Sequence, residues 1–365
     1  MKKNILITGG AGFIGSNFIP YFAKKYPDYN IINLDLLTYA GDLDNLAEMG
    51  YARKTTYIDV CVENFMRRIF PYYDTGANYT FIKGDIRNRK LVNKIFETYD
   101  IKGVIHFAAE SHVDNSIKNP DAFITTNING TFELLNAAKN HWMTAPRKPR
   151  AGYEHSNFHH VSTDEVYGSL GDSGLFTETT AYDPSSPYSA AKASSDHIVN
   201  AYHRTFGMNV TISNCSNNYG PKQNVEKLIP KTITNALSGK EIPVYGAGAN
   251  IRDWLYVLDH CKGIDRVFHI GNRGETYNIG GRNEKTNIEI VTNICGILDE
   301  LNPRRGGGKY ADLIKFVADR PGHDLRYAID ASKIERLGWK AEETFDTGIA
   351  KTVKWYLYQF LTNGR

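Results

Sequence analysis

Short apolar runs and segments with helical spacing alternate along the first part of the chain. The apolar runs that we expect to form buried strands are 5–8, 30–35, 79–86, 103–109, 158–163 and 210–214. The segments with helical spacing between them include 89–99, 121–142 and 187–206. This alternation predicts the α/β class, with a Rossmann-like, doubly wound parallel sheet.

Beyond residue 208 the strict alternation loosens. Short strands are expected at 242–245, 253–257 and 275–280, among helices, which is typical of a second and smaller lobe. We therefore predict a first domain at 1–208 and a smaller C-terminal α/β lobe at 209–365 that is interleaved with it. The stretch near 50–78 has a weak pattern and is interpreted as an insertion into the first domain, most simply at its surface.

The first predicted strand runs directly into a glycine turn, Gly9-Gly10-Ala11-Gly12-Phe13-Ile14-Gly15. Glycines at positions 9, 12 and 15 allow a sharp turn, close approach of a pyrophosphate and packing of the next helix, whose N-terminus attracts phosphate. A glycine pattern alone also fits a simple turn, and the strand before it and the helix after it favour dinucleotide binding.

An acid follows the glycine turn at the end of the second predicted strand. Asp35 stands about 20 residues further on, where a carboxylate holds the adenosine ribose. It also repels a 2′-phosphate, so NAD is favoured over NADP. The other residues that we expect to line this cofactor site are Phe13, Ile14, Leu36, Thr38, Asp85, Ile86 and Ala108. For Asp85, an ordinary loop acid is an equally good interpretation.

Composition narrows the classes of partner. The chain has 365 residues, of which 23% are charged and 41% hydrophobic, an ordinary globular mixture. The net charge of +3 is not clustered, and the basic run at 144–150 is best explained as solvated surface, so we expect no nucleic-acid partner. No apolar segment approaches membrane-spanning length, and the first glycines come too early for a signal peptide. Four cysteines without a C-x-x-C pair suggest reduced thiols, no metal and a cytoplasmic location.

Two groups of residues carry candidate chemistry. Tyr188 and Lys192 are four apart on a predicted helix and therefore share a face. A lysine and a positive nicotinamide ring would favour the phenolate of Tyr188 and make it a usable base, and Thr163 could bond the same substrate hydroxyl. Asp164 and Glu165 follow Thr163 at a predicted strand end. Taken alone, the first pair also fits an amphipathic surface and the second a solvated loop.

Six further segments carry a family resemblance: 108–114, 162–168, 214–221, 226–230, 252–257 and 319–324. With the glycine turn and the Tyr188 and Lys192 pair, they resemble the extended short-chain dehydrogenase/reductases that act on nucleotide sugars, and within that group the dTDP-glucose 4,6-dehydratases. The resemblance covers nearly the whole chain. Asn115 stands where that family has Arg, and Val225 where it has Pro, which leaves the chemistry intact and loosens the assignment of the nucleotide.

The resemblance implies a lyase that converts dTDP-glucose to dTDP-4-keto-6-deoxyglucose and water, a precursor of rhamnose-type deoxysugars. Tyr188 would take the C4 hydroxyl proton as hydride passes to NAD, and Thr163 would help position the hexose. Glu165 would remove the C5 proton that the 4-ketone acidifies, and Asp164 would protonate the departing C6 hydroxyl. Hydride would then return to C6, so NAD stays bound, and Lys192 would also hold the nicotinamide ribose.

The resemblance further implies a nucleotide-sugar site, mainly in the lobe at 209–365. Its expected residues are Glu110, Ser111, Asn217, Lys227, Leu228, Ile229, Arg252, Asn287, Arg320 and His323. Arginine suits the diphosphate because its fork matches phosphate oxygens. A homodimer is expected through the long helices at 121–142 and 188–206.

Two other functions fit parts of the pattern. A UDP-hexose 4-epimerase, a decarboxylase or another nucleotide-sugar enzyme of this scaffold needs Thr163, Tyr188 and Lys192 but no acid and base at 164 and 165. A catalytically inactive NAD-binding protein needs none of the three. The Asp164 and Glu165 pair therefore favours dehydration.

Overall fold

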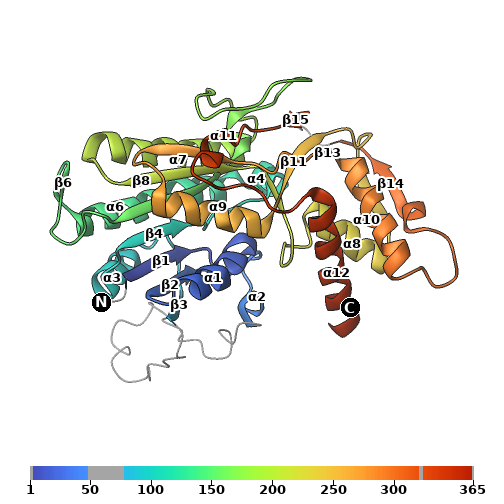
Figure 1. Cartoon of the computed structure of the whole chain (residues 1–365), viewed down its shortest axis with the longest axis horizontal. Coiled ribbons are helices and arrows are strands. Elements are labelled where there is room, and N and C mark those ends of the chain that lie inside the picture. The colour runs from blue at the N-terminus through green and yellow to red at the C-terminus, as the bar shows by residue number, and fades with distance from the viewer. Residues whose placement is uncertain (1–2, 48–77, 320–323, 364–365) are drawn as a thin grey trace.

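A parallel sheet of seven strands organises the molecule, and the computed structural model describes residues 3–47, 78–319 and 324–363 of it (Figure 1). The sheet order is β12-β8-β7-β4-β1-β2-β3, and all neighbours are parallel. Its strands are β1 (Lys3–Thr8), β2 (Tyr29–Asp35), β3 (Tyr79–Lys83), β4 (Gly103–His106), β7 (Asn157–Thr163), β8 (Val210–Cys215) and β12 (Glu275–Ile279). The predicted doubly wound sheet is confirmed. The predicted insertion near 50–78 lies almost wholly outside the described residues.

Helices cover both faces of this sheet. One face carries α1 (Phe13–Lys25) and α9 (Val257–Ile270), and the other carries α3 (Arg89–Tyr99), α6 (Thr131–Trp142) and α7 (Pro187–Phe206). Alternate residues of β1 point to opposite faces: Leu6 packs in the α3, α6 and α7 core, and Ile5 and Ile7 in the α1 and α9 core. Two fully buried faces explain why the strands read as continuous apolar runs.

The segment predicted as one helix over 121–142 is helical but not uniform. It consists of α5 (Pro120–Phe123), a π-helical turn η1 (Ile124–Gly130) and α6. Asn127 in the wide turn accepts a hydrogen bond from the Glu110 backbone N–H at 2.8 Å and donates one to the Glu110 carbonyl at 3.0 Å. These two hydrogen bonds tie the π-helical turn to the loop after β4.

The smaller lobe forms around β11. Strands β13, β11 and β15 neighbour each other in that order, β9 also pairs with β11, and β10 pairs with β14. The elements of this lobe are β9 (Asn217–Tyr219), α8 (Leu228–Leu237), β10 (Ile242–Tyr245), β11 (Ile251–Tyr256), β13 (Glu284–Thr286), α10 (Asn287–Leu301), η3 (Tyr310–Leu313), β14 (Ile314–Val317), β15 (Arg326–Tyr327) and α12 (Phe345–Asn363). Because β8 and β12 complete the large sheet from beyond residue 208, the two parts of the chain are interleaved. The boundary at 208 itself stays a prediction.

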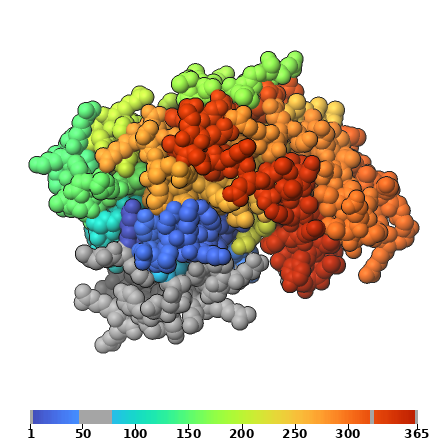
Figure 2. Space-filling model, in the orientation of Figure 1, coloured from blue at the N-terminus to red at the C-terminus, as the bar shows by residue number. Residues whose placement is uncertain are grey.

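The two lobes are in contact along the C-terminal segment. From α11 (Ser332–Glu335), which packs near β12, the chain crosses to α12 in the smaller lobe, and Figure 2 shows this red segment lying over the orange elements of both lobes. The remaining short elements are α2 (Asp44–Ala47), α4 (Val113–Lys118), β5 (Met143–Ala145), β6 (Lys148–Pro149) and the 3-10 turn η2 (Asp164–Tyr167). Strands β5 and β6 form a hairpin in the predicted basic connection.

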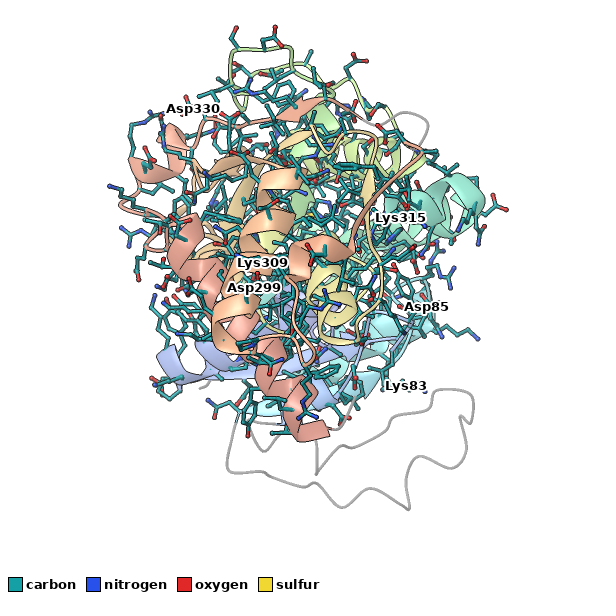
Figure 3. All side chains as sticks on the ribbon, turned by 90° about the vertical axis from the view of Figure 1, so that its right-hand side faces the viewer. Lys83, Asp85, Asp299, Lys309, Lys315 and Asp330 are labelled. Atoms are coloured by element: carbon teal, nitrogen blue, oxygen red, sulfur yellow. The ribbon has the colours of Figure 1, made fainter. Side chains whose placement is uncertain are left out.

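Surface chemistry is mixed in sign. Figure 3 shows side chains of both charges on each lobe, with Lys83 and Asp85 by β3 and Asp299, Lys309 and Lys315 on the smaller lobe. Within the ranges that the structure describes, no helix is both long and apolar enough to cross a membrane, and no cluster of three His, Cys, Asp or Glu side chains has a metal-binding arrangement. The described cysteines are buried and not disulfide-bonded: Cys215, Cys261 and Cys295.

Candidate active site

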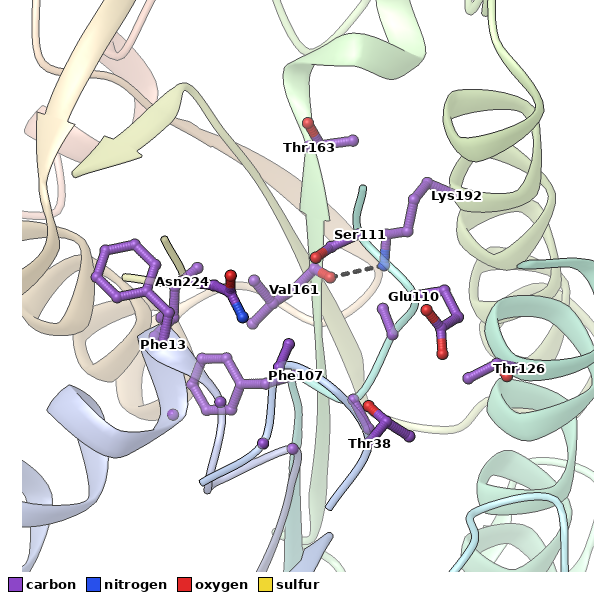
Figure 4. Close-up of a pocket in the computed structure, with 18 of the residues that line it drawn as sticks. Phe13, Thr38, Phe107, Glu110, Ser111, Thr126, Val161, Thr163, Lys192 and Asn224 are labelled. Atoms are coloured by element: carbon purple, nitrogen blue, oxygen red, sulfur yellow. Dashed lines mark hydrogen bonds between the residues drawn. The ribbon is translucent and has the colours of Figure 1, made fainter. Parts of the chain in front are cut away.

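A cavity of about 400 Å³ opens where the strands of the large sheet end (Figure 4). Parallel strands place their carboxyl ends at one edge of a sheet, so polar residues after different strands meet there. All five predicted catalytic residues line this cavity: Thr163, Asp164, Glu165, Tyr188 and Lys192. The predicted cofactor residues that line it are Gly9, Gly12, Phe13, Ile14, Gly15, Asp35, Leu36, Thr38, Asp85, Ile86 and Ala108. The predicted substrate residues that line it are Glu110, Ser111, Asn217 and Lys227.

The glycine turn forms the floor of the cavity where β1 passes into α1. Gly9 has φ of 74°, and a Cβ there would lie 2.6 Å from the backbone nitrogen of Ala108. At Gly15 a Cβ would lie 2.4 Å from the Gly9 carbonyl oxygen. Gly12 is the N-cap residue of α1 and supplies no side-chain cap. The first N–H groups of α1 therefore have no side-chain partner at the cap and suit a pyrophosphate group.

Asp35 ends β2 at the edge of the same cavity. Its carboxylate accepts hydrogen bonds from the backbone N–H groups of Ala11 at 2.9 Å and Leu37 at 2.8 Å. Burial raises the pKa of Asp35, and these two hydrogen bonds oppose the shift. The two N–H groups orient the carboxylate, and its remaining lone pairs suit ribose hydroxyls.

The strand β7 delivers Thr163, Asp164 and Glu165 into the cavity. The Thr163 side chain caps η2 by accepting a hydrogen bond from the Glu165 backbone N–H at 3.3 Å, so the strand turns sharply and displays both acids. Asp164 is 1% exposed, and its Oδ2 has no hydrogen-bond partner in the described part of the chain. Burial, followed by the nearby charges of Glu165 and Asp253, raises the pKa of Asp164 well above its usual range. Burial therefore favours the protonated form of Asp164.

The helix α7 supplies the tyrosine and the lysine. A capping box of Ser186 and Ser189 fixes its first turn, which carries the buried Tyr188. The Lys192 ammonium donates to the Val161 carbonyl at 2.8 Å, as the dashed line in Figure 4 shows. Burial lowers the pKa of Lys192 to about 8.

The structure changes one expectation about this pair. Burial, followed by the charge of Glu165, raises the pKa of Tyr188 well above its usual value. The Lys192 ammonium is directed at β7 rather than at the phenol. The lysine by itself therefore does not make Tyr188 a base, and a lowered tyrosine pKa needs further positive charge in the cavity.

Four predicted substrate residues do not line this cavity. Ile229 is buried in the core of the smaller lobe, and Leu228 packs against that core. The guanidinium of Arg252 donates to the carbonyls of Ile251 and Asp324, and Asn287 begins α10. Their assignments, like those of Arg320 and His323 outside the described residues, stay predictions.

Sequence reasoning missed two charged residues that line the cavity, Arg87 and Glu226. Arg87 forms an ion pair with Asp85 at 2.6 Å, and Glu226 lies 3.8 Å from the His112 ring. A basic residue two positions after a strand-end acid was the signal available for Arg87. Glu226 begins the segment 226–230 that carries the family resemblance, but its approach to His112 joins two distant segments and has no local signal.

These features define a class: an extended short-chain dehydrogenase/reductase with a Rossmann-like cofactor domain. A protein-family model described as GDP-mannose 4,6 dehydratase matches residues 6–77 and 71–352. The dTDP-glucose 4,6-dehydratase of Neisseria gonorrhoeae is 51% identical over 360 residues, which are 98% of this chain and 96% of the relative. The chain belongs to the dTDP-glucose 4,6-dehydratase family.

Two solved structures of the same family have this fold. The dTDP-glucose 4,6-dehydratase of Streptomyces venezuelae, with NAD and TYD bound, is 43% identical with a TM-score of 0.81. That of Bacillus anthracis, in complex with NAD, is 42% identical with a TM-score of 0.79. In both comparisons 98% of each chain is covered.

Proposed function

We propose that the protein converts dTDP-glucose to dTDP-4-keto-6-deoxyglucose and water, with NAD retained through turnover. The observation that carries the proposal is the pairing of a buried acid, Asp164, whose pKa is raised by burial, with Glu165 at the strand end that also bears Thr163. An enzyme that only oxidises and reduces C4 has no use for a second acid and base. Membership of the dTDP-glucose 4,6-dehydratase family supports the same reaction.

The chain has the features that NAD requires. Gly9 and Gly15 leave room where a Cβ would collide with backbone, and the N-terminus of α1 would bind the pyrophosphate. Asp35 would hold the adenosine ribose and Lys192 the nicotinamide ribose. When bound, NAD supplies the hydride acceptor for C4 oxidation and the hydride donor for C6 reduction.

In the oxidation step, Tyr188 accepts the proton of the C4 hydroxyl and Thr163 holds the hexose. Because burial raises the pKa of Tyr188, the phenolate forms only beside positive charge, which Lys192 and the nicotinamide ring supply together. The C4 alcohol loses one hydride and one proton and becomes a ketone.

In the elimination step, the 4-ketone acidifies the C5 hydrogen. Glu165 takes this proton, and Asp164 gives its own proton to the C6 oxygen, which leaves as water. Hydride then returns to C6 and a proton to C5, so the sugar loses one water without net oxidation. The division of labour follows from environment: burial favours the protonated form of Asp164, whereas Glu165 is only partly buried.

The test is to incubate the purified protein with dTDP-glucose and to measure the product mass and the NAD balance. The expected product is lighter by one water, with no consumption of added NAD. A product of unchanged mass with inverted C4 would overturn the proposal in favour of a 4-epimerase. Parallel reactions with UDP-, CDP- and GDP-glucose measure nucleotide preference, for which we expect dTDP.

We also propose a cytoplasmic homodimer that associates through α7 and the neighbouring helices. Ile117 on α4 is 47% exposed, and Ile124 on η1 is 47% exposed, and both elements pack against α7. Exposed large apolar side chains beside a long helix suit a subunit interface. Light scattering is expected to give the mass of two chains, and of one chain after Ile124→Glu. A monomeric parent protein would refute the dimer, and recovery in membrane fractions would refute the location.

A further inference from the structure

A buried imidazole and a buried carboxylate stand behind Lys192, on the side away from the cavity. His160 Nε2 lies 3.2 Å from the Lys192 ammonium nitrogen and 3.3 Å from Asp196 Oδ1. The side chains of His160 and Asp196 are 1% and 0% exposed. Lys192 and Asp196 are four apart on α7, and His160 lies on β7 beneath them. None of the steps of dehydration uses His160 or Asp196.

The carboxylate of Asp196 is held as an anion by its surroundings. Its Oδ2 accepts hydrogen bonds from the hydroxyls of Ser162 at 2.8 Å and Tyr182 at 3.0 Å. Its Oδ1 has no hydrogen-bond partner in the described part of the chain and faces the His160 ring. A fully buried carboxylate is tolerated only beside a compensating positive charge. The Lys192 ammonium is the cation that this arrangement supplies.

The contacts also fix where the ammonium points. A lysine ammonium has three N–H donors and no acceptor. One donor bonds the Val161 carbonyl at 2.8 Å, and a second faces His160 Nε2 at 3.2 Å. The third is left to point at the cavity that Lys192 lines. His160 Nε2 also lies 3.1 Å from the Ser195 hydroxyl oxygen, and it accepts from the ammonium in the neutral tautomer that carries its proton on Nδ1.

We infer that Asp196 and His160 are positioning residues that keep the Lys192 ammonium charged and aimed at the cofactor side of the cavity. The inference rests on the proposed function in one respect, the contact of Lys192 with the nicotinamide ribose. Neither residue lines the cavity. Asp196 acts by its charge, and His160 acts by accepting one of the three ammonium hydrogens.

The charges of Lys192 and Asp196 each favour the ionised form of the other residue, as this inference requires. Burial lowers the pKa of Lys192 to about 8, and the charge of Asp196 raises it. Burial raises the pKa of Asp196 to about 6, and the charge of Lys192 lowers it. The other titratable groups around the three residues come from β4, β7, η2, α7, β8 and the loop before α7: His106, His159, Asp164, Glu165, Tyr167, Tyr182, Tyr188, His197 and Cys215.

The test follows the titration of Lys192 directly, by the ¹³Cε chemical shift of protein labelled with [ε-¹³C]lysine. The spectrum of Lys192→Arg assigns the signal. In Asp196→Asn the midpoint is expected to fall, because the charge of Asp196 raises the Lys192 pKa. Tyr182→Phe keeps the carboxylate and its charge, so the Lys192 midpoint is expected to change much less than in Asp196→Asn.

Asp259→Asn is the matched control. Asp259 is also 1% exposed, but its carboxylate accepts from the backbone N–H groups of Glu342 and Glu343 and takes no part in the Lys192 contacts. An unchanged Lys192 midpoint in Asp196→Asn, or an equal shift in Asp259→Asn, would overturn the inference. If Asp196→Asn does not fold, an unchanged midpoint in Asp196→Ser does so.

A kinetic measurement separates positioning from a general loss of structure. The alkaline limb of the kcat profile is expected to move to lower pH in Asp196→Asn, with KM for dTDP-glucose unchanged. A loss of kcat by the same factor at every pH would contradict positioning. The NMR titration needs no turnover, so a shifted midpoint in a protein that does not dehydrate dTDP-glucose would leave this inference standing and refute the proposed function.

Discussion

Replacement of His260 should make the protein less sensitive to acid. His260 lies on α9 and is fully buried, and neither ring nitrogen has a hydrogen-bond partner in the described part of the chain. Burial lowers its pKa to about 3. The imidazole therefore stays neutral in the folded state at pH values at which the unfolded chain is already protonated.

The sign and size of the effect follow from proton linkage. An unfolded histidine titrates near pH 6.5, so between about pH 6.5 and 3 the unfolded state binds one more proton at this position, and stability falls as the pH falls. At pH 5 the loss from His260 is about 2 kcal/mol, one and a half pH units at about 1.4 kcal/mol each. At pH 8 there is no such loss.

His260→Leu removes this proton. The free energy of unfolding is measured by urea denaturation followed by circular dichroism, for the variant and for the parent protein. The difference, variant minus parent, should be about 2 kcal/mol larger at pH 5 than at pH 8. The difference between the two pH values cancels the packing cost of the substitution, whatever its sign. It also cancels the contributions of the other buried histidines, which both proteins contain.

His155→Leu is the control, because His155 is exposed and its replacement removes no buried imidazole. For this variant the change in unfolding free energy should be the same at the two pH values. Parallel pH dependence of His260→Leu and the parent protein would show that His260 is protonated in the folded state or bonded to water, and would refute the reasoning.

Three further predictions concern the site and the core. The side chain that Asp164→Asn introduces cannot protonate the C6 oxygen, so kcat should fall by about 10²-fold or more, while rapid-quench analysis still detects the 4-ketone. Equal loss of C4 oxidation and of elimination would contradict the role of Asp164 as the acid. Gly9→Ala places a Cβ 2.6 Å from the Ala108 nitrogen at a φ of 74°, so NAD affinity measured by fluorescence should fall at least about tenfold. Asp265→Asn should lower the free energy of unfolding by about 2 kcal/mol at pH 7 and by less toward pH 2. Burial opposes ionisation of Asp265, but contacts from His269 and Lys25 outweigh it and lower the pKa to about 2. The stability that the Asp265 charge contributes is therefore lost as the pH falls through that value.

The sequence predicted most of the large sheet and most of the cavity wall. Six of the seven strands were predicted as apolar runs bounded by polar or glycine residues, and both signals are local. The seventh, β12, carries Glu, Thr and Asn and was expected among the short strands of the smaller lobe. The Thr163, Asp164 and Glu165 display could be predicted because residues after a strand of a parallel sheet fall at one edge. The function of these three residues was assigned from the family resemblance, because the local sequence pattern fits a solvated loop equally well.

Features made by distant contacts could not be read in this way. The π-helical turn at 124–130 keeps apolar spacing close to that of an α-helix, and what distinguishes it is the pair of hydrogen bonds between Asn127 and the Glu110 backbone. The His160 and Asp196 pair is likewise invisible, because the two residues lie on different elements 36 positions apart in the sequence. Spacing along the chain carries no information on such a contact.

Two buried carboxylates near the end of β7 show how one fold gives the same chemical group two different proton affinities. Asp196 receives two hydroxyl donors and faces a lysine across an imidazole, so its pKa rises only to about 6 and it is an anion at neutral pH. Within the described part of the chain, Asp164 has one long contact, 3.4 Å from the Thr163 hydroxyl, and burial and nearby like charges raise its pKa well above the usual range. When two environments move the pKa values of two carboxyl groups apart, one group can act as a proton donor and the other as a fixed charge. Asp164, the proton donor, lines the cavity, where it can protonate the C6 oxygen during elimination. Asp196, the fixed charge, lies behind Lys192, where it can support the lysine during oxidation.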